Sequence, residues 1–311
     1  MTSSILPLEP MTPIRCERLP TGEEWGYQLK WDGVRIISHI DMSGSVHLYS
    51  RKMLGKNDVY PEIVALLQEH LPAEVRRGGL VLDGEAVVFD PQLQRPVFQL
   101  VLQRERSQAS RIVRQRWPAA YVLFDILYID GEDLRSLPYL ERHRRLSGLL
   151  PERKPSLFVS DLFTDGEALW RWVEEHDWEG VVAKRLTSPY RSGKKHSDWY
   201  KKKTALLLDV SIVGIVMRSG QPASMVMMNE HGYLGRVSLG LSDRDKQMLL
   251  RYAEQYGGAP MPFASLPAEL ARERLVWLSR PFSCRVTGLE ITAAGLLRHP
   301  KLMDFRLPTV R

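Results

Sequence analysis

The sequence predicts an α+β chain of two domains, residues 1–204 and residues 205–311. The length of 311 residues allows two hydrophobic cores of ordinary size. Up to Lys203, strand and helix patterns are mixed, which is typical of sheets covered by helices. After Lys203 the pattern changes to several strands with one intervening helix, which fits a small β-barrel.

In the first domain, β-favouring residues bounded by turn-forming residues place the strands. Residues 1–24 are rich in proline and are expected to be irregular. Strands are expected through Trp25 and Tyr27 and at 34–40, 46–49, 80–89, 121–129, 157–160, 180–184 and 199–203. Helices are expected at 61–70, 97–116, 137–149 and 165–176, the last with Asp165 as its N-cap.

In the second domain the signal is mostly that of strands. Strands are expected at 206–216, 225–229, 233–239 and 282–289. A single helix is expected over 242–256, with Ser242 as its N-cap. We place the boundary between the domains near residues 204–206, where the composition changes.

The composition is that of a globular protein, with 44% hydrophobic and 26% charged residues. No apolar run approaches the roughly 20 residues needed to span a bilayer, and residues 1–20 lack the pattern of a secretory signal. The two cysteines, Cys16 and Cys284, are too few and too far apart for a disulfide framework or a zinc knuckle. We therefore expect a cytoplasmic protein with no membrane partner.

The net charge of +6 and the pI of about 9.3 point to an anionic partner. Cations concentrate in two runs. One holds Lys184, Arg185, Arg191, Lys194, Lys195, Lys201, Lys202 and Lys203, and the other Arg104, Arg106, Arg111, Arg114 and Arg116. The first run also contains aromatic residues, which favours a phosphate or nucleic-acid site. For the second run, a solvated charged face remains an equal alternative.

The stretch from Tyr27 to Arg35 holds the most suggestive lysine of the chain. Lys30 stands between apolar residues, with Asp32 two positions on and Gly33 next. In an extended segment Lys30 and Asp32 point to the same face. A lysine near apolar walls and other cations can lose its proton near neutral pH and act as a nucleophile. Taken alone, however, the motif is more often a surface lysine before an Asp-Gly turn.

Other polar groups recur where predicted strands end or are interrupted. They are Ser50-Arg51, Asp83-Gly84-Glu85, Asp125 after Phe124, Glu179, and the segment 199–203. Each has an ordinary explanation on its own: a turn for the first acidic group, a core residue for Phe124, and a helix-end carboxylate for Glu179. Only their order and spacing together are specific.

In that order and spacing the chain resembles the covalent nucleotidyltransferases, which comprise ATP-dependent DNA ligases, RNA ligases and mRNA capping enzymes. It looks most like the ligase module of bacterial ligases of the ligase D type, which act in non-homologous end joining. The resemblance runs from Trp25 to about Pro300. It implies a nucleotidyltransferase (adenylation) domain of ATP-grasp-like antiparallel sheets with helices over residues 1–204, followed by an OB-fold domain over residues 205–311.

The activity that this resemblance implies is that of an ATP-dependent DNA ligase. Lys30 matches the nucleophile that attacks the α-phosphate of ATP and forms lysyl-AMP. AMP then passes to a DNA 5′-phosphate, and the 3′-hydroxyl seals the nick or break. Phosphoryl transfer depends on positioning and charge neutralisation, so cations for phosphate and carboxylates for Mg²⁺ are the expected parts.

The resemblance also implies the nucleotide-binding residues. Arg35 and Arg51 match arginines that contact phosphate and ribose, and Phe124 matches the aromatic that stacks on adenine. Lys201 and Lys203 match the lysines that grip the α-phosphate. The full expected nucleotide-binding set is Gln28, Leu29, Lys30, Arg35, Arg51, Glu85, Phe124, Val182, Lys201 and Lys203. ATP is the expected AMP donor.

For the metal, the resemblance implies carboxylate ligands for Mg²⁺ or Mn²⁺. The expected ligands are Glu179, Glu85 and Asp32. The chain departs from the family at Gln28, where most members have a glutamate that reads the adenine amino group. The amide carbonyl of a glutamine accepts a hydrogen bond as well. Residues 298–311 resemble the last family motif, without a clear assignment of its individual members.

The expected partner is nicked or broken double-stranded DNA, with Ku as a candidate end-binding protein. Without further modules the chain is expected to be a minimal ligase and a monomer. Two alternatives stay open: an RNA ligase or capping-type guanylyltransferase, and a catalytically idle nucleic-acid-binding module with the same fold. Labelled ATP or GTP, together with nicked DNA or RNA, distinguishes them.

Overall fold

The computed structural model describes residues 9–106, 111–193, 195–230, 232–289, 291–292 and 294–308. The chain divides into two compact units, Met1–Thr204 and Ala205–Arg311. Each unit has its own sheets and its own buried apolar cluster. In the described part of the chain, no helix has the length and apolar character that crossing a bilayer requires.

A four-stranded sheet in the first unit carries the Lys30 segment at its edge. Its strand order is β1 (Thr12–Arg15), β12 (Lys195–Lys203), β11 (Gly180–Arg185) and β2 (Trp25–Leu29). The last three strands are antiparallel neighbours, whereas β1 runs parallel to β12. Strand β1 is a correction, because residues 1–24 were expected to be irregular and Thr12–Arg15 forms an edge strand.

The second sheet of this unit contains the predicted strands 34–40 and 46–49 as an antiparallel hairpin. Its order is β10 (Leu157–Val159), β8 (Ala120–Ile129), β5 (Leu80–Val87), β3 (Val34–Ile40) and β4 (Val46–Ser50), and β9 (Glu132–Asp133) pairs with β8. The strands β6 (Phe89–Asp90) and β7 (Arg95–Pro96) form a separate pair. One face of the large sheet builds the main core, with Ile36, Leu82 and Leu123 buried in it.

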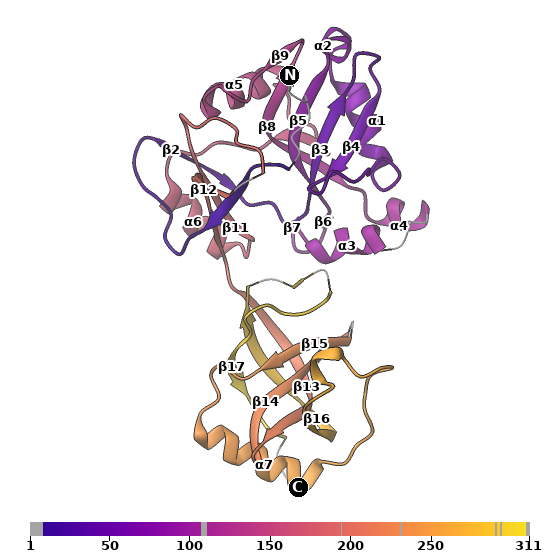
Figure 1. Ribbon diagram of the computed structural model, residues 1–311, viewed down its shortest axis with the longest axis vertical. Helices are drawn as coiled ribbons and strands as arrows, with labels where there is room; N and C mark the ends of the chain where they lie inside the picture. Colours follow the sequence, from indigo (N-terminus) through magenta and orange to yellow (C-terminus); the bar gives the residue numbers. More distant parts are fainter. Residues whose placement is uncertain are drawn as a thin grey trace. The chain divides into compact units, whose positions relative to one another are not determined.

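Helices pack against both sheets of the first unit (Figure 1). They are α1 (Pro61–His70), α2 (Ala73–Gly78), α3 (Phe98–Arg106), α4 (Arg111–Arg116), α5 (Tyr139–Leu149) and α6 (Gly166–Glu175). Helix α1 contacts β4, α5 contacts β8, and α6 contacts β2 and β11. The predicted N-cap is confirmed, because the Asp165 side chain accepts from the backbone N–H groups of Glu167 and Ala168. The helix predicted over 97–116 includes α3, α4 and residues 107–110, which lie outside the described residues.

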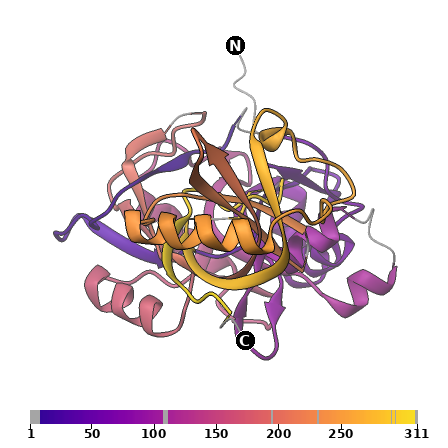
Figure 2. The same ribbon diagram turned by 90° about the horizontal axis from the view of Figure 1, so that it is seen from below.

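The second unit is a five-stranded antiparallel sheet with one long helix. Its order is β15 (Gly232–Val237), β14 (Gln221–Asn229), β13 (Leu206–Arg218), β16 (Arg274–Gly288) and β17 (Lys301–Phe305). Helix α7 (Asp243–Tyr256) contacts β14 and β16 and is seen side-on in Figure 2. Its predicted N-cap Ser242 forms a complete capping box with Asp245. A short 3₁₀ helix, Ala268–Leu270, precedes β16.

Gly180 sets the close approach of β11 to β12 beside the Lys30 segment. Its φ of 152° belongs to the region that favours glycine. A Cβ atom added there would lie 2.1 Å from the carbonyl oxygen of Lys202. The Gly180 carbonyl accepts from the backbone N–H of Lys30 at 2.9 Å. A glycine is therefore required at the point where β2, β11 and β12 meet.

We expect Gly180→Ala to lower the free energy of unfolding by at least about 2 kcal/mol, because both the backbone angle and the contact with Lys202 become unfavourable. The matched control is Gly148→Ala in α5, where an added Cβ meets nothing within 4 Å. That change should stabilise the chain by about 0.5–1 kcal/mol, as alanine favours helix. Urea unfolding of the two variants measures this, and equal effects would contradict the assigned role of Gly180.

Candidate functional site

A cavity of about 440 Å³ lies in the first unit, lined by residues of both large sheets. One wall comes from β1, β2, β11 and β12, and the other from β3, β4, β5, β8 and the segments next to them. The lining residues are Thr12, Pro13, Gln28, Leu29, Lys30, Trp31, Gly33, Val34, Arg35, Ser50, Arg51, Lys52, Glu85, Phe98, Phe124, Val182, Lys184, Trp199 and Lys201. Nine of the ten residues expected to bind nucleotide are among them, and the tenth, Lys203, lies on the same strand as Lys201.

Strand register brings three of these residues into a row. Gln28 of β2 stands opposite Val182 of β11, which stands opposite Lys201 of β12. Side chains alternate along strands, so residues two positions away return to the same face. That places Lys30 and Lys203 on the cavity side one row further along, on either side of Gly180.

Glu179 holds the two lysines of that row together. Its Oε2 atom accepts from Lys30 Nζ at 2.5 Å, and its Oε1 atom lies 2.8 Å from Lys203 Nζ. All three side chains are largely buried, with 11% to 19% of their surfaces exposed. A partly desolvated ion triplet of this kind is held more firmly than a surface pair, because solvent screens it less.

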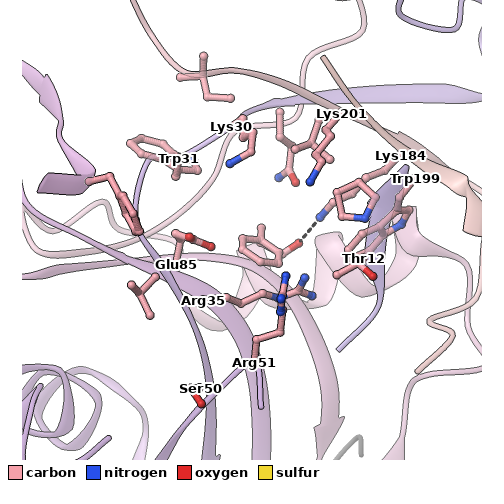
Figure 3. A pocket seen from close by; sticks show the side chains of 18 of the residues that line it. Thr12, Lys30, Trp31, Arg35, Ser50, Arg51, Glu85, Lys184, Trp199 and Lys201 are labelled. Atoms are coloured by element: carbon pink, nitrogen blue, oxygen red, sulfur yellow. Dashed lines mark hydrogen bonds between the residues drawn. The ribbon is translucent and has the colours of Figure 1, made fainter. Parts of the chain in front are cut away.

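Figure 3 shows Lys30 and Lys201 on one side of the cavity, with Glu85, Arg35 and Arg51 facing them. Arg51 is exposed at the rim beside Ser50 and Lys52. Positively charged side chains therefore line both walls of the cavity. This is an arrangement that suits a polyphosphate.

Arg35 is engaged by the protein itself. Its Nε and Nη2 atoms donate to the carboxylate of Asp83 at 2.8 and 2.5 Å, and its Nη1 atom donates to the Met11 carbonyl at 2.7 Å. Tyr190 donates its hydroxyl to the same carboxylate at 2.8 Å. Asp83 is completely buried and lies behind the cavity wall, outside the set of lining residues. These hydrogen bonds hold the Arg35 guanidinium in a fixed position in the cavity wall.

Asp32 and Glu85 are the two carboxyl groups next to the triplet. Burial raises the pKa of Asp32 to about 6 and that of Glu85 to about 8, and the negative charge of Glu179 adds to both shifts. Asp32 also accepts from the backbone N–H of Phe98 at 3.0 Å. Carboxylate oxygens are the donors that Mg²⁺ takes, and a divalent cation would relieve the repulsion among these groups.

Carboxylate oxygens suit a hard cation such as Mg²⁺, although these carboxylates are not clustered around one point. Among the residues that the structure describes, no three carboxylate, histidine or cysteine side chains are close enough together to hold a metal ion. Both oxygens of Glu179 are occupied by lysines instead.

Lys184 is a cavity residue that the sequence did not reveal. It was expected to belong to a basic run, but only 2% of it is exposed. Its Nζ atom lies 4.6 Å from the ring centre of Phe124, 4.4 Å from that of Tyr139 and 4.3 Å from that of Trp199. Burial lowers the pKa of Lys184 to about 7. The alternation of β11 was the signal that could have shown it, because Lys184 shares the face of Val182.

The other basic run is also partly internal. Arg104 is completely buried and donates to the carbonyl oxygens of Trp117 and Val59 while pairing with Glu62. It therefore supports the fold and does not face a partner. Lys194 of the first run lies outside the described residues.

The comparisons with known proteins agree on one family. The model of the ATP dependent DNA ligase domain matches residues 14–203, which is more than half of the chain. The chain belongs to the ATP-dependent DNA ligase family. The ligase match covers every strand that lines the cavity except the first two residues of β1.

The ligase relatives include longer proteins. The chain is 32% identical to the multifunctional non-homologous end joining protein LigD of Pseudomonas aeruginosa, over 91% of this chain and 33% of that protein. It is 30% identical to the bifunctional non-homologous end joining protein LigD of Bacillus subtilis, over 79% and 42%. The chain thus spans about a third to two fifths of the length of these relatives.

Solved structures of ligases give the same result. The ligase domain of Mycobacterium tuberculosis LigD superposes with a TM-score of 0.56 at 30% identity, over 96% of this chain and 95% of that one. A mycobacterial DNA ligase D complexed with ATP and MES gives the same values.

The raised pKa of Glu85 leads to a prediction about stability and pH. Between about pH 4.5 and pH 8 the folded chain keeps a proton on Glu85 that the unfolded chain releases, so the free energy of unfolding falls as the pH rises. Glu85→Gln imitates the protonated side chain and should be more stable than the wild type at pH 8, by on the order of 2 kcal/mol. The difference should shrink toward pH 5.

Urea unfolding across this pH range measures the effect. Glu254→Gln on α7 is the control, because Glu254 is exposed and the change should leave the pH dependence unaltered. If Glu85→Gln shows the same slope with pH as the wild type, then Glu85 is not held in its protonated form.

Proposed function

We propose that this chain is an ATP-dependent DNA ligase that works through a lysyl-AMP intermediate on Lys30. The observation that carries the proposal is the position of Lys30 Nζ, which lines the cavity 2.5 Å from Glu179, with Lys203 paired to the same carboxylate. Membership of the ligase family and the mycobacterial relative solved with ATP support it.

In the first step, Lys30 Nζ attacks the α-phosphorus of ATP. The N–P bond forms as the bond between that phosphorus and the bridging oxygen of the leaving pyrophosphate breaks, and Lys30 loses a proton. Lys201, which lines the cavity, and Lys203, which pairs with Glu179, are proposed to neutralise the charge on the α-phosphate. Arg35 and Arg51 of the opposite wall are proposed to contact phosphate and ribose. Such fixed cations are what stabilises a phosphoryl-transfer transition state.

Phe124 is proposed as the platform on which adenine stacks, with Gln28, Leu29 and Val182 completing the base site. Glu85 and Glu179, with Asp32 nearby, are the residues that would hold Mg²⁺, and Glu85, which lines the cavity, is also proposed to contact the ribose. When bound, the metal would stabilise negative charge on the phosphates.

In the later steps AMP passes from Lys30 to a DNA 5′-phosphate, and the 3′-hydroxyl attacks that phosphate with release of AMP. The names of the Pseudomonas aeruginosa and Bacillus subtilis relatives support a role in non-homologous end joining. The proposal therefore includes broken double-stranded DNA as a substrate and Ku as the partner that binds its ends.

Residues 1–204 are proposed as the adenylation domain and residues 205–311 as an OB-fold domain. Support for the OB-fold comes from the strand order β15-β14-β13-β16-β17 and from the place of α7 between β15 and β16. A parallel bridge between Leu239 and Lys301 brings the ends of the two outer strands together. These are the connections that a partly open five-stranded barrel requires.

The test is incubation with α-labelled ATP and Mg²⁺, after treatment with pyrophosphate to remove any AMP already bound. We expect a covalent adduct on the wild type, none on Lys30→Ala, and a loss of adduct formation of about a hundredfold or more in Lys201→Ala and Lys203→Ala. Lys202→Ala is the matched control, because that side chain points to the other face and packs on Trp170, 3.6 Å from its ring centre.

No adduct on the wild type would overturn the proposed function. A GTP adduct in place of an AMP adduct would favour a capping-type enzyme, and sealing of nicked RNA in preference to nicked DNA would favour an RNA ligase. An adduct that Lys202→Ala also abolishes would show that the assignment of the two strand faces is wrong.

A further inference from the structure

Trp178 directly precedes Glu179, and the turn that ends helix α6 fixes its backbone. Asp177 adopts a left-handed conformation with a φ of 53°, and the N–H of Trp178 donates to the Val173 carbonyl at 3.0 Å. These are the features of a Schellman motif, which ends a helix and reverses the chain. The Trp178 ring also packs on Trp172, with ring centres 5.4 Å apart, which is the apolar contact that accompanies such a motif. The turn therefore places Trp178 and Glu179 at a defined point.

The main chain around Glu179 is held from the other side as well. The Trp178 carbonyl accepts from Thr204 Oγ1 at 2.7 Å, and the Glu179 carbonyl accepts from the Thr204 N–H at 3.0 Å. The next carbonyl, that of Gly180, accepts from the N–H of Lys30 at 2.9 Å. Hydrogen bonds thus fix three successive carbonyl groups, and the orientation of the side chains depends on packing.

The packing partner of Trp178 on the cavity side is Trp31. Their ring centres lie 5.1 Å apart and the rings meet edge to face at 74°, a favourable arrangement for two aromatic groups. Trp31 is itself held, because its Nε1 atom donates to Ser160 Oγ at 3.0 Å and its ring packs edge-on against Phe158. Since Trp31 directly follows Lys30, the ring pair ties the Lys30 segment to the end of α6.

Trp31 and Lys30 line the cavity (Figure 3), whereas Trp178 lies outside the set of lining residues. An effect of Trp178 on the reaction must therefore pass through its neighbours. We infer that Trp178 is a positioning residue, whose ring, packed between Trp31 and Trp172, keeps the Glu179 carboxylate against Lys30 Nζ. This inference rests on the proposed function, in which the nucleophile and the carboxylate act on one nucleotide.

Loss of the Trp178 ring would leave the backbone bonds to Thr204 intact and remove the contact with Trp31. The Glu179 side chain and the Lys30 segment could then shift relative to each other. Rates of group transfer depend steeply on such positions, and a displacement of about 1 Å can cost about a hundredfold. The expected defect is therefore in the rate of reaction and not in the binding of the nucleotide.

The experiment measures formation of the covalent AMP adduct on the whole chain over a range of ATP concentrations, after treatment with pyrophosphate. We expect Trp178→Ala to lower the rate constant at saturating ATP by about tenfold or more. The half-saturating ATP concentration should change by less than about threefold, because Trp178 does not line the cavity. Trp178→Phe keeps an aromatic ring against Trp31 and should react within about threefold of the wild type. Partial unfolding lowers the amplitude of adduct formation and leaves the rate constant unchanged.

Trp170→Ala is the matched control. Trp170 lies on the same helix and is half-buried like Trp178, but it packs on Lys202, whose Nζ atom lies 3.6 Å from its ring centre. A general loosening of α6 would affect both variants, whereas the inference predicts a rate constant within about threefold of the wild type for Trp170→Ala.

A Trp178→Ala variant that reacts as fast as the wild type would overturn the inference. So would a Trp170→Ala variant with an equal loss, or a Trp178→Phe variant as slow as Trp178→Ala. In each of these cases the wild type still forms the AMP adduct, so the proposed function stands. If the wild type forms no adduct with ATP, the proposed function fails and this inference fails with it.

Discussion

The site depends on one shared carboxylate, Glu179, which binds Lys30 and Lys203 at once. Lys30 directly follows β2 and Lys203 ends β12, the two strands that flank β11. Gly180 lies between them, and its missing side chain lets β11 approach β12 where a Cβ would clash with the Lys202 carbonyl. Two like charges this close would repel each other without the carboxylate. Strand register, glycine and ion triplet therefore depend on one another, and the cavity takes its shape from them.

Three ionisable groups around the triplet of Lys30, Glu179 and Lys203 have pKa values shifted toward their uncharged forms. Asp32 and Glu85 hold their protons more tightly than usual, whereas Lys184 holds its proton less tightly. Burial causes all three shifts, because it disfavours whichever form carries the charge. Several shifted pKa values within one cavity are typical of functional sites.

Sequence reasoning worked where the signal was local. The hairpin of β3 and β4, the N-caps Asp165 and Ser242, and the long strand β8 were all predicted, because neighbouring residues determine them. Strand β1 was missed because it is short, contains proline, and pairs with β12 far along the chain. The packing of Trp178 on Trp31 also joins distant segments. The site residues could be proposed from motif order, but their partners needed the structure.

The most direct measurement is to locate the AMP by mass spectrometry of peptides from the chain after reaction with ATP. Digestion must be kept near neutral pH or above, because a lysyl phosphoramidate is lost in acid. The account predicts the AMP on Lys30, in the peptide that contains Trp31 and Asp32. AMP on Lys184 or Lys201, with Lys30 unmodified, would contradict it.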